Sequence, residues 1–288
     1  MACETKSSPL VTVMIPVFNG EKTIARALRS LLYQTYDKWN AIVVDDGSSD
    51  NTVDVVNKIS DPRILIKHTR NKGRAAARQT ALNAASGDYI AYLDADDFHH
   101  PEKLSRQIKY MLSNPDIVFS GCGVGSFKTG FGLLRVRADF SFSDKVHKFG
   151  KPIRISPISS IIKTDIAKSE AYLESLTYGE DMDYFQRVLD GKLCGAIPDV
   201  LHFYSEFDDV TARKMISAYF PIIKNHIFNL KTNKLLRVRS LLSCCSRMAA
   251  IAFICLFFGK DRVLLRRGRP ALPEEKRVFA EILKTLEV

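Results

Sequence analysis

The sequence predicts an α/β protein with a mostly parallel sheet flanked by helices. Two observations support this fold class. Over the first hundred residues, short β-branched apolar runs alternate with segments whose apolar residues recur at helical spacing. The segments between the runs are long enough for right-handed crossovers, which connect parallel strands. With 288 residues, the chain can form one large domain of this class with an appendage, or two small domains.

Four strands and three helices are expected in this first part. The strands are predicted at residues 10–16, 41–44, 63–67 and 88–93, and the helices at 21–36, 51–59 and 73–85. The first helix shows the pattern most clearly, because its apolar residues share one face: Ile24, Leu28, Leu31 and Leu32. Strands with continuous apolar runs are buried on both faces, so helices should cover both sides of the sheet.

The alternation becomes irregular beyond Pro101. We expect helices at 102–112 and 178–191, a strand at 116–120, and one or two strands within 193–204. Residues 121–155 stay unassigned. Within them, Gly121–Gly125 opens no convincing helix and has no acidic partner further on, so we interpret it as a loop. Since His99 and His100 have no metal-ligand spacing to a second His or Cys, we place them in a surface loop.

Basic residues concentrate in the C-terminal part of the chain. Between Thr211 and Leu272 there are 13 Lys and Arg and one acid, Asp261, whereas the rest of the chain carries 29 basic and 31 acidic residues. We therefore expect a nearly neutral globule with a strongly basic segment. Nucleic acid is not expected as a partner, because this segment has no recognisable binding motif and its aromatic residues are not interleaved with the basic ones.

The six cysteines show neither C-x-x-C spacing nor histidine-rich surroundings. This pattern argues against a structural zinc and against a disulfide scaffold, so we expect reduced thiols in the cytoplasm. Residues 1–9 are short and polar and lack the apolar core of a secretory signal.

Acidic residues follow two of the predicted strands. Asp45 and Asp46 end the second strand, and Asp94, Asp96 and Asp97 end the fourth. Because the carboxyl ends of parallel strands meet at one edge of the sheet, these carboxylates should lie where ligands bind. Close carboxylates repel each other unless a cation lies between them, and their oxygens suit Mg²⁺ or Mn²⁺. For any single acid, the alternative is a helix cap or a turn.

Five motifs occur in order along the chain: I-P-V-F-N at 15–19, V-D-D-G-S-S-D at 44–50, N-x-G-x-x-x-A-R at 71–78, L-D-A-D-D at 93–97 and G-E-D at 179–181. Each is weak alone, but the ordered set resembles the inverting family 2 glycosyltransferases of the GT-A fold, of the bacterial polysaccharide-biosynthesis type. The resemblance is close over residues 1–115 and looser to residue 205. It implies a Rossmann-like sheet and three parts: a nucleotide-sugar-binding half at 1–115, an acceptor-binding and catalytic-base half at 116–209, and a helical, basic, membrane-associating segment at 210–288.

The resemblance also implies a role for each residue of the donor site. Pro16, Val17 and Phe18 would line the uracil pocket, mainly through their backbone. Asp46 would accept a hydrogen bond from the uracil ring, and Arg78 would lie near the base and the phosphates.

For the reaction, the resemblance places Asp94 at the ribose and Asp96, together with Asp94, at a Mn²⁺ or Mg²⁺ ion that bridges the diphosphate. Asp181 would be the catalytic base, with Glu180 as its neighbour. A metal stabilises the charge on the leaving diphosphate, and a carboxylate takes the proton of the attacking hydroxyl. The alternative for Glu180 and Asp181 is a structural role as acids in the first turn of a helix. We expect Arg187 to form a structural ion pair.

The chain departs from the family pattern after the strand that follows the base helix. Ser205 and Phe207 stand where family members often carry an Arg and a His. Arg213 or Lys214 could supply the missing basic group. The third protein contact to the metal or the diphosphate therefore stays open.

Met248–Phe258 is a run of eleven apolar residues between two basic flanks. As a helix it would be about 16 Å long, roughly half the thickness of the hydrocarbon core of a bilayer. The flanks at 231–239 and 260–269 are densely basic, which favours a helix that lies in the interface of an anionic membrane. A spanning helix over 241–258 and a buried core helix are the alternatives.

These features predict a hexosyltransferase that acts with inversion, taking a sugar from a UDP-sugar to a hydroxyl of a lipid-linked or growing saccharide. The enzyme would be cytoplasmic and peripherally associated with the inner face of the cell membrane. Two alternatives are open. One is a nucleotidyltransferase, which also uses paired aspartates and a metal but releases pyrophosphate. The other is an inactive transferase-like protein that docks on membranes.

Overall fold

The computed structural model describes residues 8–138, 144–149, 153, 155–177, 179–217, 219, 223 and 234–287. Its strands are β1 (Val11–Val17), β2 (Trp39–Asp45), β3 (Ile64–His68), β4 (Tyr89–Tyr92), β5 (Phe98–His99), β6 (Phe119–Lys128), β7 (Gly132–Arg137), β8 (Lys145–Val146), β9 (Ile161–Lys163), β10 (Leu193–Tyr204) and β11 (Arg269–Pro270). They form a sheet in the order β11–β7–β6–β9–β4–β1–β2–β3, and β10 pairs with β5, β6 and β8.

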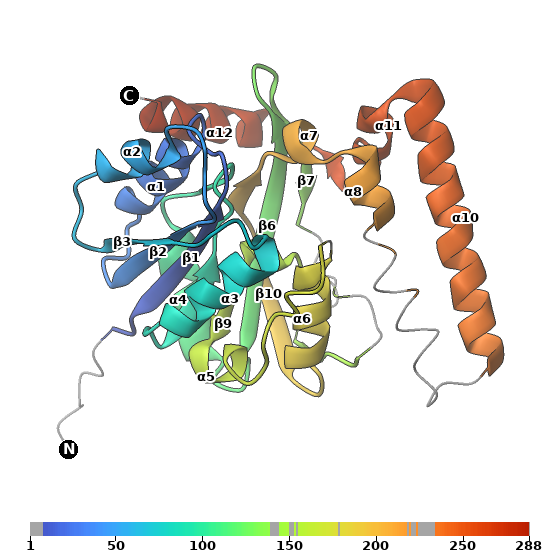
Figure 1. Ribbon diagram of the computed structural model, residues 1–288, viewed down its shortest axis with the longest axis horizontal. Helices are drawn as coiled ribbons and strands as arrows, with labels where there is room; N and C mark the ends of the chain where they lie inside the picture. The colour runs from blue at the N-terminus through green and yellow to red at the C-terminus, as the bar shows by residue number, and fades with distance from the viewer. Residues whose placement is uncertain are drawn as a thin grey trace.

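Helices lie on both faces of this sheet (Figure 1). They are α1 (Ile24–Leu32), α2 (Thr52–Asn57), α3 (Arg74–Ala84), α4 (Lys103–Ser113), α5 (Thr164–Ala167), α6 (Glu180–Val188), α7 (Glu206–Asp209), α8 (Ala212–Ser217), α10 (Lys234–Phe258), α11 (Lys260–Leu264) and α12 (Pro273–Leu286). This arrangement confirms the predicted fold class.

The first half of the sheet is parallel, as the alternation of strands and helices predicts. β2 and β4 flank β1, and β3 lies beyond β2, each pair in parallel register. Successive residues of β1 face opposite sides of the sheet. Val13 and Ile15 belong to the core cluster that contains Leu28 of α1, whereas Met14 belongs to the cluster that contains Ala81 of α3. Apolar runs without alternation therefore mark strands covered on both faces.

The second half of the sheet is mixed, which corrects the expectation of a mostly parallel sheet. β9 pairs antiparallel with β4 and with β6, β7 pairs antiparallel with β6, and β10 runs parallel to β6. The interpretation of Gly121–Gly125 as a loop is wrong, because these residues form the buried middle of β6. A Cβ atom on Gly123 would lie 2.7 Å from the carbonyl oxygen of Asp199. Glycine at this position therefore lets β10 approach β6 closely.

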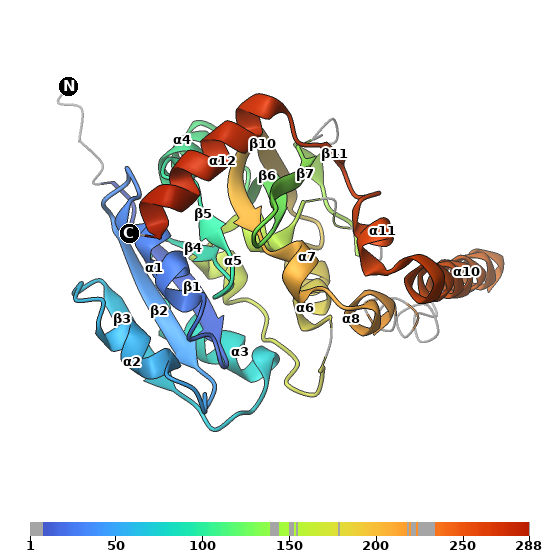
Figure 2. The same cartoon turned by 90° about the horizontal axis from the view of Figure 1, so that it is seen from above.

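The C-terminal part of the chain returns to the sheet. β11 pairs antiparallel with β7, and α12 runs above the sheet until its C-terminal end reaches α1 (Figure 2). Phe279 of α12 lies with its ring centroid 5.3 to 5.6 Å from those of three core phenylalanines: Phe98, Phe127 and Phe203. Such aromatic clusters bury much apolar area. β11 and α12, which lie within the expected segment 210–288, therefore pack on the globule.

Helix α10 lies at the edge of the molecule beside α8 (Figure 1). By length and composition, it is the one helix in the described part of the chain that could cross a membrane, through Leu241–Phe258. Only 6% of that window is buried, so α10 is not a core helix of this globule. Ile251 and Cys255 pack against the core, whereas the large apolar residues near the end of the helix are exposed: Phe253, Leu256, Phe257 and Phe258.

Two titratable side chains lie buried near the centre of the molecule. The expectation of a surface loop is wrong for His99, because β5 pairs with β10 and buries its ring completely. Lys103, the first residue of α4, is also fully buried, and its Nζ has no hydrogen-bond partner within the described residues. Burial lowers the pKa of Lys103 to about 8 from its usual 10.5.

We predict that Lys103→Met stabilises the protein at neutral pH. A lysine whose pKa is lower in the folded than in the unfolded state destabilises the folded state at every pH where the unfolded chain is more protonated. From a shift of this size we expect Lys103→Met to raise the free energy of unfolding by about 3 kcal/mol below pH 8. The gain should shrink as the pH rises from about 8 to about 10.5, where both states are neutral. Urea unfolding of the variant and of the unmodified protein at pH 7 and pH 10 gives this gain at each pH.

Lys109 provides the control for this prediction, because it is exposed on the same helix. Lys109→Met should change the free energy of unfolding little, and equally at both pH values. A loss of stability in Lys103→Met at pH 7 would contradict the prediction.

Candidate active site

The candidate site lies at the carboxyl edge of the parallel strands. Phe18 follows β1, Asp46 follows β2, and the turn from Asp94 to Asp97 follows β4. Parallel neighbours bring these strand ends together, as the sequence predicts. Helix α6 adds Glu180 from the other half of the chain, since its carboxylate reaches Arg78 of α3.

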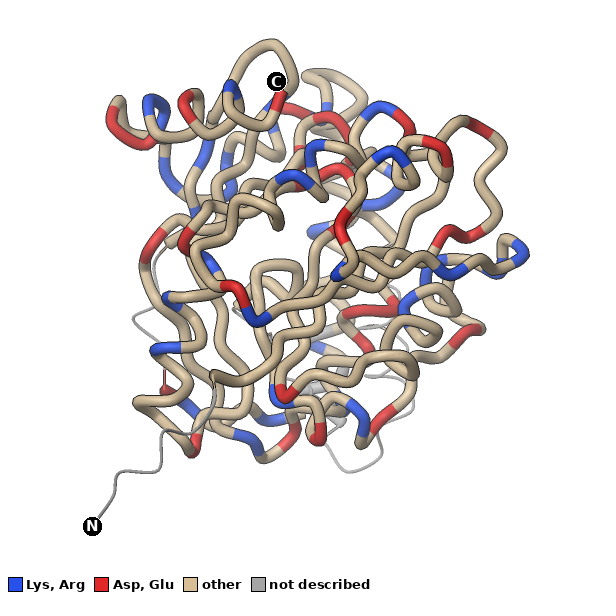
Figure 3. The backbone as a smooth tube through the Cα atoms, turned by 90° about the vertical axis from the view of Figure 1, so that its left-hand side faces the viewer, with Lys and Arg blue, Asp and Glu red and all other residues tan. Residues whose placement is uncertain are grey.

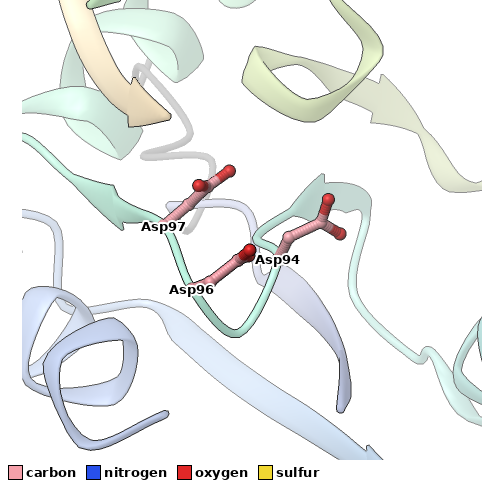
Figure 4. A group of neighbouring side chains, drawn as sticks. All are labelled: Asp94, Asp96 and Asp97. Atoms are coloured by element: carbon pink, nitrogen blue, oxygen red, sulfur yellow. The ribbon is translucent and has the colours of Figure 1, made fainter. Parts of the chain in front are cut away.

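Three carboxylates converge on the turn after β4. One oxygen each from Asp94, Asp96 and Asp97 can be chosen so that all lie within 4.8 Å of one another. The three side chains project to the same side of the turn (Figure 4). Carboxylate oxygens of this number and spacing fit Mg²⁺ or Mn²⁺, which also takes water and substrate phosphates as ligands. The cluster contains both residues proposed to hold the metal, Asp94 and Asp96.

Asp97 connects this turn to β10. Its Oδ1 accepts a hydrogen bond from the Ser205 amide at 2.8 Å, and its Oδ2 lies 3.1 Å from Nε2 of His202. Burial lowers the pKa of His202 to about 3, so its imidazole is neutral near pH 7. Burial and the charge of Asp94 raise the pKa of Asp97 well above its usual range. Asp97 thus fixes the turn to β10 and lies next to the candidate metal ligands Asp94 and Asp96.

Ser205 brings a fourth carboxylate to the cluster. Its Oγ lies 3.0 Å from Oδ2 of Asp96 and 3.0 Å from Oδ2 of Asp209 in α7. Burial raises the pKa of Asp209, whereas the charge of Lys214 opposes that rise. Lys214 is one of the two cations expected to replace the missing basic group, and its contact with a metal or a diphosphate stays a prediction. Sequence reasoning missed Asp209, because no motif connects it with the turn after β4.

Arg26 of α1 stabilises the turn after β4 through a backbone contact. Its Nη2 donates a hydrogen bond to the carbonyl oxygen of Asp96 at 2.6 Å. The guanidinium carbon lies 5.5 Å from the ring centroid of Phe98 and 5.2 Å from that of Phe127. Cation–π contacts of this kind stabilise a guanidinium that has lost part of its water. Burial lowers the pKa of Arg26, and the charge of Asp97 opposes this effect. The sequence pattern gives no sign of this role.

Arg78 joins α6 to the turn after β4, which we call the metal turn because it carries the candidate ligands Asp94 and Asp96. It is buried, and it donates to Oδ1 of Asp94 and to Oε1 of Glu180, both at 3.0 Å. Its Nη1 also lies 4.0 Å from Oδ2 of Asp181. Although burial opposes its charge, the three carboxylates hold the pKa of Arg78 well above its usual value. In this structure Arg78 links carboxylates, and its expected position near the base and phosphates stays a prediction.

Glu180 and Asp181 begin α6 directly after Gly179, which has a left-handed φ of 72°. Glu180 is buried, and burial raises its pKa. Its Oε1 also lies 3.4 Å from Nε of Arg74. No pattern in the sequence indicates this contact. The Asp181 side chain is 30% exposed, so its carboxylate is accessible to a substrate. Of the two acids, Asp181 therefore fits the role of base and Glu180 that of its support.

Arg187 lies near the C-terminal end of α6, about two turns beyond these contacts. It forms ion pairs with Asp183 at 2.9 Å and with Glu170 at 2.5 Å. The expectation of a structural ion pair for Arg187 is confirmed. Its charge is therefore used to connect α6 with the segment before it.

At the donor end of the site, Asp46 fixes the loop that leads into α3. Its Oδ1 accepts hydrogen bonds from Oγ1 of Thr69 at 2.6 Å and from the Lys72 amide at 2.9 Å. Its Oδ2 accepts one from the Gly73 amide at 2.7 Å. Asp46 thus holds the start of α3, where a carboxylate is favoured. The predicted contact with a uracil ring would have to share these oxygens.

The three residues expected around the uracil differ in exposure. Val17 is buried, and its carbonyl oxygen accepts the Asp46 amide at 2.8 Å. Pro16 is half-buried, whereas the Phe18 side chain is 48% exposed beside the strand end. An exposed aromatic ring at this edge offers a surface on which a base can stack. Their contact with a nucleotide stays a prediction.

The sequence profile described as "Glycosyl transferase family 2" matches residues 12–168, more than half of the chain. The chain belongs to glycosyl transferase family 2. This membership accounts for the ordered motifs and confirms the resemblance that they carry. The matched residues include the carboxylates after β2 and β4 and end before the base helix.

Two similar proteins come from Escherichia coli. One is the UDP-Glc:alpha-D-GlcNAc-diphosphoundecaprenol beta-1,3-glucosyltransferase WfgD, which is 48% identical over 106 residues, 36% of this chain and 42% of WfgD. The other, WfaP, carries the same description and is 46% identical over 103 residues, 35% of this chain and 41% of WfaP. The matches thus span about two fifths of the length of these relatives.

Two solved structures share this fold. TarS 1-349 of S. aureus, in complex with UDP, has a TM-score of 0.63 and 19% identity, and the match covers 96% of this chain and 80% of that one. The mannosyltransferase PcManGT from Pyrobaculum calidifontis, in complex with GDP-Man and Mn²⁺, has a TM-score of 0.62 and 18% identity over 98% of this chain and 86% of that one. At these identities the likeness establishes the fold, which is the GT-A fold.

We predict that Asp96→Ala weakens Mn²⁺ binding by at least about tenfold, because the substitution removes a carboxylate ligand from the cluster. Titration of the protein with Mn²⁺, followed by electron paramagnetic resonance of the free ion, gives the affinity. Asp208→Ala removes the same charge from α7, where Asp208 accepts hydrogen bonds from Thr129 instead of facing the turn. It should bind Mn²⁺ nearly as well as the unmodified protein. Equal affinities for Asp96→Ala and the unmodified protein would exclude Asp96 as a ligand.

Proposed function

We propose that the chain is a metal-dependent inverting glycosyltransferase that transfers a hexosyl unit from a UDP-sugar to a hydroxyl of a lipid-linked saccharide. One observation carries this proposal. Buried Arg78 joins Asp94 of the metal turn to Glu180 beside the accessible carboxylate of Asp181. The candidate metal ligand and the candidate base would thereby be held in a fixed relation through one guanidinium, as positioned catalysis requires.

The donor assignment is supported by the charge of the metal turn. Asp94 and Asp96 would hold Mn²⁺ or Mg²⁺, which supplies a Lewis acid for the negative charge on the leaving diphosphate. TarS is described in complex with UDP and with UDP-GlcNAc, and WfgD is named for UDP-Glc. We therefore assign a UDP-sugar as donor. Phe18 and Asp46 lie at the strand ends where its uracil would bind.

The base assignment is supported by accessibility. An acceptor hydroxyl is a poor nucleophile near neutral pH and needs a carboxylate to take its proton. Asp181 offers such a carboxylate at the start of α6, whereas Glu180 is buried and paired with Arg78. One base opposite the leaving group gives a single displacement with inversion. No second carboxylate has to form a covalent intermediate with the sugar.

The acceptor and the membrane assignment are supported by α10 and by the relatives. WfgD and WfaP are named for an acceptor carried on diphosphoundecaprenol, a lipid. Helix α10 exposes apolar side chains at its C-terminal end, and α11 adds basic residues directly after it. On the side of the molecule opposite α10, by contrast, acidic and basic residues are interspersed (Figure 3). We propose that α10 docks the enzyme on the inner face of the cell membrane.

The path of the chain favours a helix that lies in the membrane interface over one that spans the bilayer. α8 precedes α10 and packs beside it, and β11 and α12 follow it and pack on the sheet. A single crossing would put the two ends of α10 on opposite sides of the bilayer. Both flanking parts belong to one globule, so the chain would have to cross back. An interfacial helix with an exposed apolar face has no such requirement.

We predict that Asp181→Asn lowers turnover by about 10²-fold or more, because the amide keeps the shape but cannot take the proton of the acceptor. UDP affinity should stay near that of the unmodified enzyme, since the donor site lies after β1 and β2. UDP release from a panel of UDP-sugars, with membrane lipid extract as acceptor, measures turnover. Retained turnover in Asp181→Asn, together with its loss in Glu180→Gln, would move the role of base to Glu180. Transfer with retention of configuration would overturn the inverting mechanism.

We predict that the protein binds vesicles that contain anionic lipid more tightly than neutral ones, and that salt weakens this binding without abolishing it. Basic residues supply the part that salt screens, and the apolar face of α10 supplies the rest. Leu256→Ser with Phe257→Ser should lower vesicle binding at least about tenfold, because both side chains are exposed on α10. Cosedimentation measures the bound fraction.

The matched control replaces apolar side chains that are exposed elsewhere. Leu65 of β3 and Leu112 of α4 are exposed on the globule. Leu65→Ser with Leu112→Ser should leave vesicle binding unchanged. If both double variants lose binding equally, or neither does, α10 is not the docking element.

A further inference from the structure

Glu206, the first residue of α7, is a buried carboxylate with two arginine partners. It is 1% exposed as a side chain. It accepts hydrogen bonds from Nη1 of Arg137 in β7 at 2.8 and 3.0 Å, and from Nη1 of Arg267 at 2.6 Å. The Oγ of Ser126 in β6 donates a further hydrogen bond to Glu206 at 2.6 Å. One buried negative charge thus fixes two positive charges, which leaves the cluster with a net charge of +1.

Each arginine uses one terminal nitrogen for Glu206. Within the described residues, no further hydrogen bond is made by either guanidinium. Their side chains are 28% and 39% exposed, so the remaining N–H groups face solvent. A guanidinium carries five donors in a planar fork that matches the oxygens of a phosphate. Arg137 and Arg267 are therefore oriented by Glu206 and free to bind an anion on their outer side.

The cluster lies beside the metal turn. Ser205, which directly precedes Glu206, has its Oγ 3.0 Å from Oδ2 of Asp96. Lys260 of α11 donates to the carbonyl oxygen of Phe207 at 2.7 Å, which fixes α7 against the C-terminal segment. The same short helix therefore connects the metal ligands, the two arginines and the end of α10.

Apolar and basic surfaces meet at this cluster. Ile251 and Cys255 of α10 pack against the core cluster that contains Phe207 and Leu264, so α10 is held next to α7. Its other side chains near Phe258 are exposed. The end of β6, the strand β7 and the segment from α11 through β11 add a dense set of cations: Lys128, Arg135, Arg137, Lys260, Arg262, Arg266, Arg267 and Arg269. Against these, the same segments contain one acid, Asp261.

We propose that Arg137 and Arg267, held by Glu206, bind the diphosphate of a lipid-linked acceptor while its hydrocarbon chain lies along the exposed side of α10. This assignment rests on the proposed function. In such an acceptor, a short saccharide separates the attacking hydroxyl from the diphosphate, so the anion has to bind close to the metal turn. The donor diphosphate is placed at Asp94 and Asp96, which leaves the two arginines for the second diphosphate. The order of metal turn, arginines and apolar helix matches the order of sugar, diphosphate and lipid.

The test uses decyl diphosphate below its micelle-forming concentration, with saturating UDP and Mn²⁺ so that the donor site is filled. Isothermal titration calorimetry should give an affinity at least about tenfold higher than for decylphosphocholine, which has the same chain without the diphosphate. Arg137→Lys and Arg267→Lys keep the charge but lose the fork. Each should remove most of this preference and leave the affinity for UDP unchanged.

Arg262→Lys is the matched control, because Arg262 is an exposed cation of α11 that is not part of the Glu206 cluster. It should keep the full preference. Equal affinities of the unmodified protein for the two decyl compounds would overturn the proposal, as would an equal loss in Arg262→Lys, which indicates general attraction to anions. A fall in UDP affinity in Arg137→Lys or Arg267→Lys would assign the arginines to the donor instead. Absence of UDP binding by the unmodified protein would overturn the proposed function itself.

Discussion

Repulsion among carboxylates at one edge of the sheet is the constraint that organises this molecule. Asp94, Asp96 and Asp97 lie on a single turn, and Asp209 and Glu180 approach it from other elements. Such groups raise one another's pKa unless cations stand between them. Without compensating cations, the carboxylates of the turn would either take up protons or destabilise the fold around them. The arrangement of the arginines follows from this requirement.

The compensating cations come from elements that are far apart in the sequence. Arg26 belongs to α1 and Arg78 to α3, yet both reach the turn after β4. Arg26 in turn depends on Phe98 and Phe127, which Phe279 of α12 covers from outside. Residues outside the turn therefore decide the geometry of its three carboxylates. A site of this kind is preorganised by its surroundings, which is what electrostatic catalysis requires.

The sequence predicts the first half of the fold well, because periodicity and strand ends are local features. The parallel strands, the helices between them and the convergence of Asp46 with Asp94 and Asp96 all follow from alternation and from the rule for strand ends. The second half is harder. Gly121–Gly125 looks like a loop by composition, but close approach of β10 makes glycine necessary in a buried strand.

The sequence predicts only those residues of the candidate site that stand in recognisable motifs. The three aspartates and the pair Glu180–Asp181 stand in recognisable patterns. Arg267 and Glu206, in contrast, are 61 residues apart, and only the pairing of β11 with β7 brings Arg267 into reach. No pattern along the chain marks a residue whose role comes from a distant partner. Arg26 and Asp209 were missed for the same reason.

The place of α12 in the chain also sets an order of events during synthesis. Segments leave the ribosome from the N-terminus onward, and domains begin to fold as they emerge. α10 precedes α12, so its apolar face emerges before Phe279 is available to close the aromatic cluster behind Arg26. The nascent chain thus exposes the apolar side of α10 while the aromatic support of the turn after β4 is still incomplete. This surface is available for contacts before the globule is closed.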